Sequence, residues 1–170
     1  MTHEEYQQAS YYWVNKDKYN DKVPTAQLKK AMEVFIHENH TLALATGANG
    51  FVRCTPMEYT FHDGAFWMFT EGGRKFIGLE DNKNVSMCIY AQYQAIGKVK
   101  GMQILGVADM IEPFSDEYNK AAEYAKIQTK KIKKMDTQMY LIKVSPKEIE
   151  YMSSDFVEQG FSSRQKLYFQ

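Results

Sequence analysis

Apolar residues recur with a helical period near the start of the chain and with a strand period further on. One helical face is formed by residues at i, i+3, i+4, i+7 and i+8: Leu28, Ala31, Met32, Phe35 and Ile36. This spacing predicts a helix from Thr25 to about Asn39, entered after Pro24. Residues 1–23 are polar and rich in tyrosine, and their pattern predicts no more than a short helix.

Short apolar runs separated by turn residues follow this helix. They predict strands over 41–46, 51–61, 65–70, 85–90 and 97–111, with hairpin turns at 47–50 and at Asp63-Gly64. We expect a short helix over 74–81, a helix that Ser115 caps and that runs to about Lys134, and final strand segments over 138–144 and 149–152.

This order of elements predicts the fold class. Strands joined by hairpins and covered by a few helices favour an antiparallel β-barrel over a parallel doubly wound sheet. We therefore predict a mainly β fold with α-helices, containing about six to seven strands. No linker or repeat interrupts the chain, so residues 1–170 are expected to form a single domain.

Composition and charge exclude several classes of protein. The chain is 44% hydrophobic, which is too apolar for a disordered protein, and its 21 basic residues balance 21 acidic ones, which argues against a nucleic-acid partner. No apolar run approaches the roughly 20 residues that span a bilayer, and the acidic N-terminus is unlike a secretory signal. Cys54 and Cys88 form no metal motif, and each is expected to be a small buried hydrophobe. A reducing cytoplasm and no membrane association are the corresponding expectations.

The segment Glu71-Gly72-Gly73-Arg74-Lys75 carries the clearest candidate chemistry. Two glycines allow a sharp backbone turn close to a ligand, and the following helix start and cations favour an anion. The alternative is a solvated loop with two surface cations. Arg53, on a strand face with Thr55 and Met57, would also need an anionic or carbonyl partner if that face lines a cleft. The alternative is that it pairs with a surface carboxylate on an edge strand, which Pro56 would mark.

In order and spacing, these motifs resemble the pyridoxamine 5′-phosphate oxidase-like flavoproteins. The resemblance covers roughly residues 25–150, leaves N-terminal and C-terminal extensions, and rests on these segments: Arg53-Cys54-Thr55-Pro56, Asp63-Gly64, Phe66 to Thr70, Arg74-Lys75, Asn82 to Met87 and Gly106 to Asp109. It implies a split β-barrel and a homodimer that binds FMN between its subunits. It further implies an oxidoreductase that moves electrons from a nicotinamide to a small-molecule substrate.

The resemblance also implies which residues bind the flavin. Arg53, Cys54 and Thr55 would run beside the isoalloxazine and the ribityl chain, and Phe69 and Thr70 would contact the flavin. Arg74 and Lys75 would hold the phosphate. The glutamine that the family carries on its long strand falls at Gly101 here, and Gln103, two residues on, is the candidate in its place.

Departures from the family pattern limit the activity that is implied. Glu58 stands where the oxidase proper has a lysine, and the C-terminal Arg-x-His substrate signature is absent, so pyridoxamine 5′-phosphate oxidation is not expected. The alternatives are a non-catalytic flavin, haem or deazaflavin binder on the same barrel, and an interaction domain without a cofactor. Arg164 is a candidate for reaching the cofactor or closing the dimer.

The remaining polar motifs favour structural roles. His37 and His40 have an HxxH spacing without a third ligand, so a solvated or capping role is favoured over zinc and no metal site is expected. His62, at a hairpin tip, is expected at the surface. The basic run Lys130 to Lys134 is expected to be a solvated helix end, with an anionic partner as the alternative.

Overall fold

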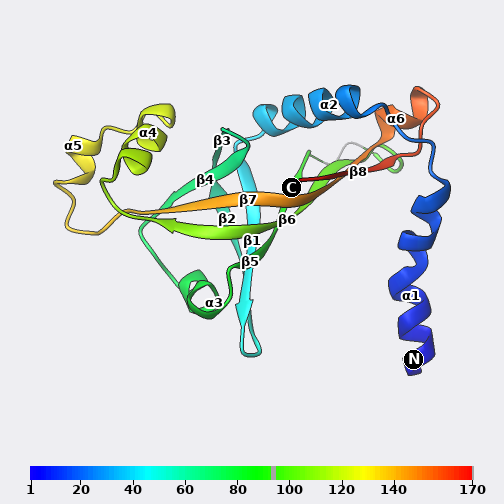
Figure 1. Ribbon diagram of the computed structural model, residues 1–170, viewed down its shortest axis with the longest axis horizontal. Helices are drawn as coiled ribbons and strands as arrows, with labels where there is room; N and C mark the ends of the chain where they lie inside the picture. Colours follow the sequence, from blue (N-terminus) through cyan, green and yellow to red (C-terminus); the bar gives the residue numbers. More distant parts are fainter. Residues whose placement is uncertain (93–94, 170) are drawn as a thin grey trace.

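The computed structural model describes residues 1–92 and 95–169. Within these residues, seven antiparallel strands follow the order β2-β1-β5-β6-β7-β4-β3 in one sheet, and β8 pairs with β7 as an eighth strand (Figure 1). The strands are β1 (Thr41–Ala48), β2 (Phe51–Glu58), β3 (Thr60–His62), β4 (Ala65–Thr70), β5 (Asn84–Tyr90), β6 (Lys100–Ile111), β7 (Tyr140–Ser153) and β8 (Arg164–Tyr168). The mainly β, split-barrel fold with flanking helices is confirmed.

Six α-helices and one 3-10 turn accompany the sheet in the described part of the chain. They are α1 (His3–Lys16), η1 (Asp17–Tyr19), α2 (Thr25–Glu38), α3 (Lys75–Asp81), α4 (Asp116–Tyr124), α5 (Thr129–Ile132) and α6 (Ser154–Glu158). No helix among the described residues is both long enough and apolar enough to cross a membrane.

Two hairpin turns fall where the sequence predicts them. Asn49 and Gly50 join β1 to β2, and Asp63 and Gly64 join β3 to β4. All four residues have positive φ values, between 50° and 81°, as the tight turns of right-twisted hairpins require. Asn and Asp tolerate this backbone region better than other non-glycine residues, which explains their use at the first position.

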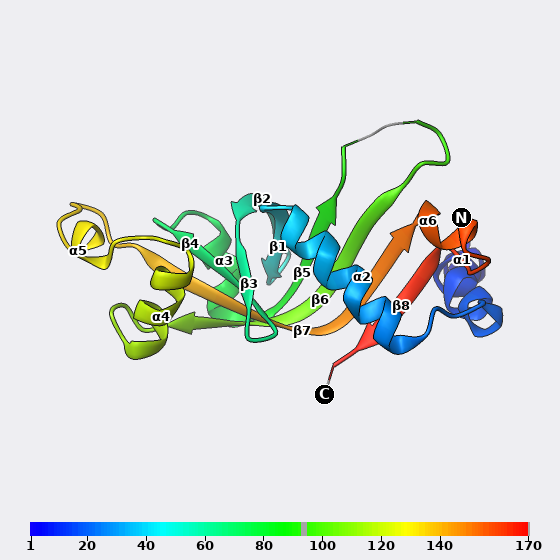
Figure 2. The same cartoon turned by 90° about the horizontal axis from the view of Figure 1, so that it is seen from above.

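Helix α2 covers the inner face of the sheet and closes the core. It lies diagonally across the strands in Figure 2 and buries Leu28, Met32, Phe35 and Ile36, the apolar face that the sequence predicts. The Phe35 ring stacks on Tyr151 of β7 with centroids 5.1 Å apart. Asn39 ends the helix and donates a side-chain hydrogen bond to the Phe35 carbonyl oxygen at 2.7 Å.

The sheet has an inner and an outer face, which the strand register separates. Leu44, Met87, Ile104 and Ile149 lie opposite one another on β1, β5, β6 and β7 and are buried beneath α2. Because side chains alternate across a strand, their neighbours point the other way. We call this opposite side of β2, β1, β5, β6 and β7 the outer face.

Helix α3 is held against β1 by a close backbone contact. A Cβ atom at Gly78 would lie 2.7 Å from the Gly47 nitrogen, so only glycine fits there. The Asn82 side chain donates to the Gly47 carbonyl oxygen at 2.8 Å, and Asn49 donates to Asp81 at 2.8 Å. These contacts fix the middle and the end of α3 beside β1 and the β1–β2 turn.

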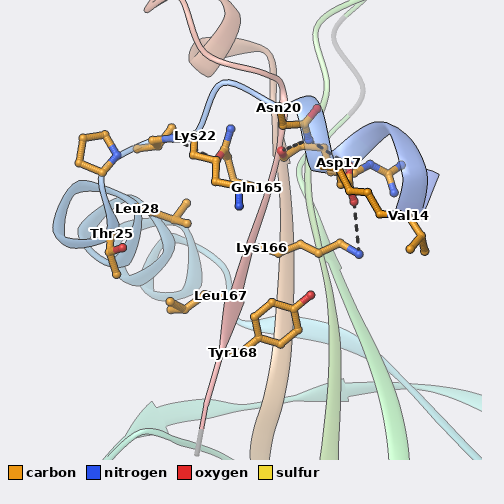
Figure 3. Close-up of a pocket in the computed structure, with 14 residues that line it drawn as sticks. Val14, Asp17, Asn20, Lys22, Thr25, Leu28, Gln165, Lys166, Leu167 and Tyr168 are labelled. Atoms are coloured by element: carbon orange, nitrogen blue, oxygen red, sulfur yellow. Dashed lines mark hydrogen bonds and ion pairs between the residues drawn. The ribbon is translucent and has the colours of Figure 1, made fainter. Parts of the chain in front are cut away.

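The chain ends meet at β8. The Arg164 guanidinium lies 4.3 Å from the centre of the Trp13 ring, and the buried Gln165 side chain donates to the Asp21 carbonyl oxygen at 3.0 Å. Between η1, the start of α2 and β8 lies a cavity of about 790 Å³ (Figure 3). Lys166 crosses it and pairs with Asp17 at 3.4 Å.

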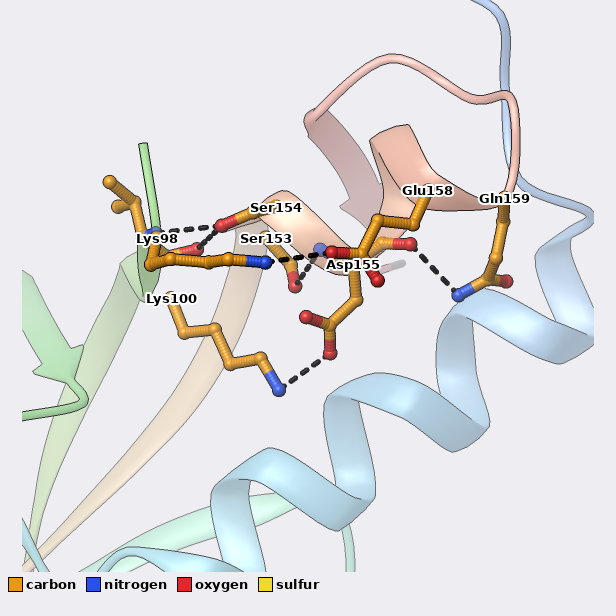
Figure 4. A network of polar contacts seen from close by, with 8 residues as sticks. Lys98, Lys100, Ser153, Ser154, Asp155, Glu158 and Gln159 are labelled. Carbon is orange, nitrogen blue, oxygen red and sulfur yellow. Dashed lines mark hydrogen bonds and ion pairs between the residues drawn. The ribbon is translucent and has the colours of Figure 1, made fainter. Parts of the chain in front are cut away.

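Helix α6 is tied to the start of β6 by a polar network (Figure 4). Lys98 pairs with Glu158 at 2.8 Å, and Lys100 pairs with Asp155 at 2.6 Å. The Ser154 hydroxyl accepts from the Val99 backbone nitrogen at 2.7 Å. These surface pairs fix the path of the chain between β7 and β8.

Several predicted elements have other boundaries in the structure. Residues 1–23, predicted to form no more than a short helix, contain the 14-residue helix α1, and the strand predicted over 97–111 begins at Lys100. The run 51–61 is split into β2 and β3, and the helix predicted to reach Lys134 ends at Tyr124, because Lys126 has a positive φ of 58° that a continuing helix cannot accept. The segments 138–144 and 149–152 form one long strand, β7, which a register shift at Leu105 and Gly106 keeps paired with β6. Strand β8 was not predicted.

Two predictions of side-chain burial are wrong. Cys54 is exposed, because β2 is an edge strand and position 54 points to the outer face, whereas Cys88 is half-buried. The His62 side chain is only 6% exposed and lies between the Trp67 and Tyr124 rings, with centroids 4.7 and 4.2 Å away. A residue beside a hairpin turn is expected at the surface from its neighbours in sequence, but here Tyr124 of α4, which is distant in sequence, covers it.

Candidate functional site

The backbone makes a sharp bend between β4 and α3. Gly72 and Gly73 have φ values of 124° and 105°, which side-chain-bearing residues rarely adopt. The Thr70 hydroxyl lies 3.3 Å from both the nitrogen and the carbonyl oxygen of Gly72 and fixes the bend from its strand side. The two glycines therefore expose the backbone where the sequence predicts a phosphate site.

Lys75 is buried directly beneath this bend. The residue is 5% exposed, and its Nζ donates to the Gly72 carbonyl oxygen. Burial lowers the pKa of Lys75 below its ordinary value, and the positive charge of Arg53 lowers it further. A buried cation beside another cation is unfavourable unless an anion is present, so the local electrostatics favour a negatively charged ligand.

Two arginines complete the cationic cluster, which we define as Arg53, Arg74 and Lys75. Arg53 lies opposite Thr46 of β1, the strand on which α3 packs, while Arg74 immediately precedes α3 and lies 5.4 Å from the Phe51 ring. None of the three forms an ion pair with another described residue, in contrast to Arg164, which pairs with Glu150 at 2.7 Å. The surface-carboxylate alternative for Arg53 therefore has no support in the described structure.

A shallow depression adjoins the bend. It is lined by Phe69, Thr70, Glu71, Gly72, Gly73, Thr137 and Met139. Phe69 is half-buried and packs edge-on against Tyr118 of α4 at 5.3 Å, so it forms a firm apolar wall. The depression combines a polar backbone loop with an apolar side, as an amphipathic ligand requires.

The remaining candidate residues lie on other parts of the sheet. Thr55 is on the same side of β2 as Arg53, and its buried hydroxyl has no hydrogen-bond partner among the described atoms. Cys54 and Gln103 are exposed on the outer face, on β2 and β6. The structure thus brings Thr70, the cationic cluster and the glycine bend together, and places Cys54 and Gln103 apart from them within one chain.

Comparison with protein families decides the relationship. The family model described as pyridoxamine 5′-phosphate oxidase matches residues 28–153, about three quarters of the chain. The chain belongs to the pyridoxamine 5′-phosphate oxidase family. The match spans all of α2 except its first turn, the sheet up to β7, the glycine bend and α3, and leaves α1 and β8 outside. No curated protein sequence matches the chain.

Solved structures of this family's fold include proteins with different ligands. The chain is similar to ChuZ of Campylobacter jejuni, with a TM-score of 0.66 and 17% identity over 86% of this chain and 61% of that one. It is similar to the haem storage protein HutZ of Vibrio cholerae (TM-score 0.59, 20% identity, 70% and 89% covered). It is also similar to an FAD-binding protein of Mesorhizobium loti (TM-score 0.56, 15% identity, 75% and 90% covered). At these identities the likeness shows the fold, and the chain spans less than two thirds of ChuZ.

Some residues of the site could not be found from local sequence patterns. Thr137 and Met139 reach the glycine bend from the segment before β7, and Tyr140 lies 3.9 Å from where a Cβ at Gly72 would be. These residues are more than 60 positions from the bend in sequence. Within this oxidase-family fold, they meet the bend because β4 pairs with the start of β7, with Thr70 opposite Tyr140.

Proposed function

We propose that this protein binds FMN, with the phosphate at the Gly72-Gly73 bend, and acts as an FMN-dependent oxidoreductase. The observation that carries the proposal is Lys75, a buried cation at the bend with no carboxylate partner in the described structure. Buried charges are normally paired, so the site is built for an anion that the chain itself does not provide. Arg74 offers a planar, bidentate donor for the same group.

The mixed polar and apolar surroundings of the bend fit the rest of the flavin. In this proposal the phosphate of FMN lies on the cationic cluster. Its ring system lies along the apolar side that Phe69 forms, past Thr70, and points toward β2, which carries Arg53 and Thr55. The orphan hydroxyl of Thr55 is available as a donor or acceptor. FMN supplies two-electron redox chemistry when bound, and the protein contributes binding, orientation and electrostatics.

The proposal includes a homodimer that completes the site. Val52, Tyr90 and Leu105 are exposed on the outer face, between 51% and 79% of their surface, in the same region as Cys54 and Gln103. Large apolar side chains left exposed on one sheet face favour an interaction surface there. A second copy seated on the outer face covers them and brings Cys54 and Gln103 into a shared interface, where both can contact a flavin held by either subunit.

The proposed reaction takes electrons from a nicotinamide and delivers them to a small acceptor. Pyridoxamine 5′-phosphate oxidation is not proposed, because Glu58 replaces the lysine of the oxidase proper and the C-terminal Arg-x-His signature is absent. Two free cysteines, one of them exposed, favour a reducing, cytoplasmic setting.

Haem binding is the second candidate function. It is favoured by the similarity to HutZ and to a haem-binding protein of Mycobacterium smegmatis, each under 25% identical to this chain. The argument against haem is that His37, His40 and His62 are poorly placed to serve as the axial ligand. His62 is enclosed between two aromatic rings, and His37 and His40 are exposed near the end of α2, away from the glycine bend.

The absorbance spectrum of purified protein tests the proposal. An absorption band at about 450 nm after purification or after adding FMN supports flavin binding, whereas a Soret band after adding haem supports the second candidate. Anaerobic bleaching of the flavin band by NADH or NADPH then supports an oxidoreductase. A protein that binds neither group overturns both candidates, and a flavin that no nicotinamide reduces restricts the protein to a holder of FMN.

A further inference from the structure

Helix α1 carries large side chains that its own chain leaves uncovered. None of its 14 residues is buried, and Tyr6, Tyr11, Tyr12, Trp13 and Val14 are each at least 44% exposed. A capping box between Thr2 and Glu5 nevertheless specifies the helix start. Isolated helices of this length are marginal in water, so a helix with a defined start and uncovered aromatic residues requires a packing surface.

The base of α1 is anchored at the edge of the outer face. Trp13 lies on the Arg164 guanidinium, and Arg164 pairs with Glu150 of β7. Glu150 is the register partner of Gln103, which points to the outer face. In Figure 1 α2 and α1 lie on opposite sides of β7, and α1 extends away from the sheet on the same side as the tip of the β1–β2 hairpin.

Only the C-terminal part of the α1 side that contacts Arg164 lies against its own chain, and the N-terminal part of that side is free. Tyr6, Ala9 and Trp13 are spaced i, i+3 and i+7, so they share one side of the helix. Trp13 uses that side to contact Arg164, whereas Tyr6 remains 61% exposed. A helix of 14 residues is about 21 Å long, so its free half reaches well past the edge of β8.

We propose that α1 is a dimerisation arm whose Tyr6–Ala9–Trp13 side packs against a second copy of this chain. This inference rests on the homodimer proposed above. A copy seated on the exposed apolar residues of the outer face lies beside α1, because α1 is anchored at the edge of that same face. A two-fold arrangement uses both arms equally, and each adds aromatic surface to an interface that needs about 800 Å² per subunit.

Two double variants of the full chain test the arm, with matched charge. Y6E/A9E places two carboxylates on the proposed contact side, and Q7E/Y11E places two on the opposite side. Both variants change the net charge by −2. They also replace tyrosines of similar exposure, because Tyr11 is 54% exposed and Tyr6 is 61% exposed. Sedimentation velocity over a concentration series gives the dimer dissociation constant of each, and circular dichroism shows that each remains folded.

We expect Y6E/A9E to weaken dimerisation at least about tenfold, which is about 1.4 kcal/mol, and Q7E/Y11E to change it less than about twofold. A dimer that Y6E/A9E leaves intact, or that both variants weaken equally, overturns the arm. A wild-type chain that is monomeric at every concentration overturns both the arm and the proposed homodimer. If FMN does not bind but Y6E/A9E still selectively weakens the dimer, the arm stands and the cofactor assignment fails.

Discussion

Replacing Lys75 by methionine should change ligand affinity and protein stability in opposite directions. Methionine keeps most of the side-chain length but removes the charge. The lost contact is a charge-assisted hydrogen bond to phosphate, which contributes about 1.5–3 kcal/mol, so we expect FMN to bind roughly 10- to 150-fold more weakly. The ligand-free protein should gain about 1 kcal/mol of unfolding free energy, because a buried cation held only by a carbonyl oxygen is replaced by an apolar group.

The pH dependence of stability provides an independent check on Lys75. Its pKa in the folded protein lies below the ordinary 10.5, mainly because of burial, so the folded state releases the proton first. Stability of the ligand-free wild type should therefore rise with pH between the lowered pKa and about 10.5, relative to Lys75→Met. The advantage of the variant should be largest near neutral pH and shrink in alkaline solution.

Fluorescence titration with FMN and urea unfolding of the ligand-free protein measure the two effects. Lys83→Met is the matched control, because Lys83 also donates to a backbone carbonyl, that of Leu79, but at the far end of α3. The control should leave FMN affinity unchanged. If Lys75→Met binds FMN within about twofold of wild type, or destabilises the ligand-free protein, Lys75 is not an unpaired buried cation that awaits a phosphate.

Three further changes probe the site and its support. Arg74→Ala should weaken FMN binding by about 1.5–3 kcal/mol in the same titration, since it removes a charged donor without burying a new group. Gly78→Ala should lower the unfolding free energy by about 1–3 kcal/mol, because its Cβ would lie 2.7 Å from the Gly47 nitrogen. Between about pH 7 and pH 5 the unfolding free energy, measured in urea, should fall less steeply with decreasing pH in His62→Phe than in wild type. Burial, opposed in part by Asp63, lowers the pKa of His62 below 6.5, so acid must charge a ring stacked on Trp67.

Each of these predictions has a contradicting result. Unchanged FMN affinity in Arg74→Ala would remove that residue from the phosphate site. Gly101→Ala, where a Cβ would lie 3.3 Å from the Ile89 carbonyl oxygen, is the milder control, and an equal or larger loss there would show that the α3–β1 contact is not special. An identical pH profile for wild type and His62→Phe would show that His62 does not titrate in that range.

Local sequence patterns predicted the elements whose causes are local. The α2 helix follows from its apolar spacing, and the β3–β4 hairpin from Asp63-Gly64, because both depend on neighbouring residues. Strand β8 could not be predicted in this way. Its short polar sequence becomes a strand only because β7 offers a free edge, with Tyr151 opposite Gln165.

In the candidate site, too, only the features with local causes could be predicted from the sequence. The glycine bend and the adjacent Arg74-Lys75 pair are contiguous in sequence, so their chemistry was visible. The burial of Lys75 and its proximity to Arg53 arise from the packing of α3 on β1, and the contribution of Met139 arises from the pairing of β4 with β7. Long-range contacts of this kind leave no periodic signal in either segment.

Recognition of a phosphate by the Gly72-Gly73 bend and its cations is tested most directly by calorimetric titration of the wild-type protein with FMN and with riboflavin. The two ligands differ only in the phosphate group. We predict that FMN binds at least about tenfold more tightly, as one or more charged hydrogen bonds require. Equal affinity for FMN and riboflavin would contradict the account.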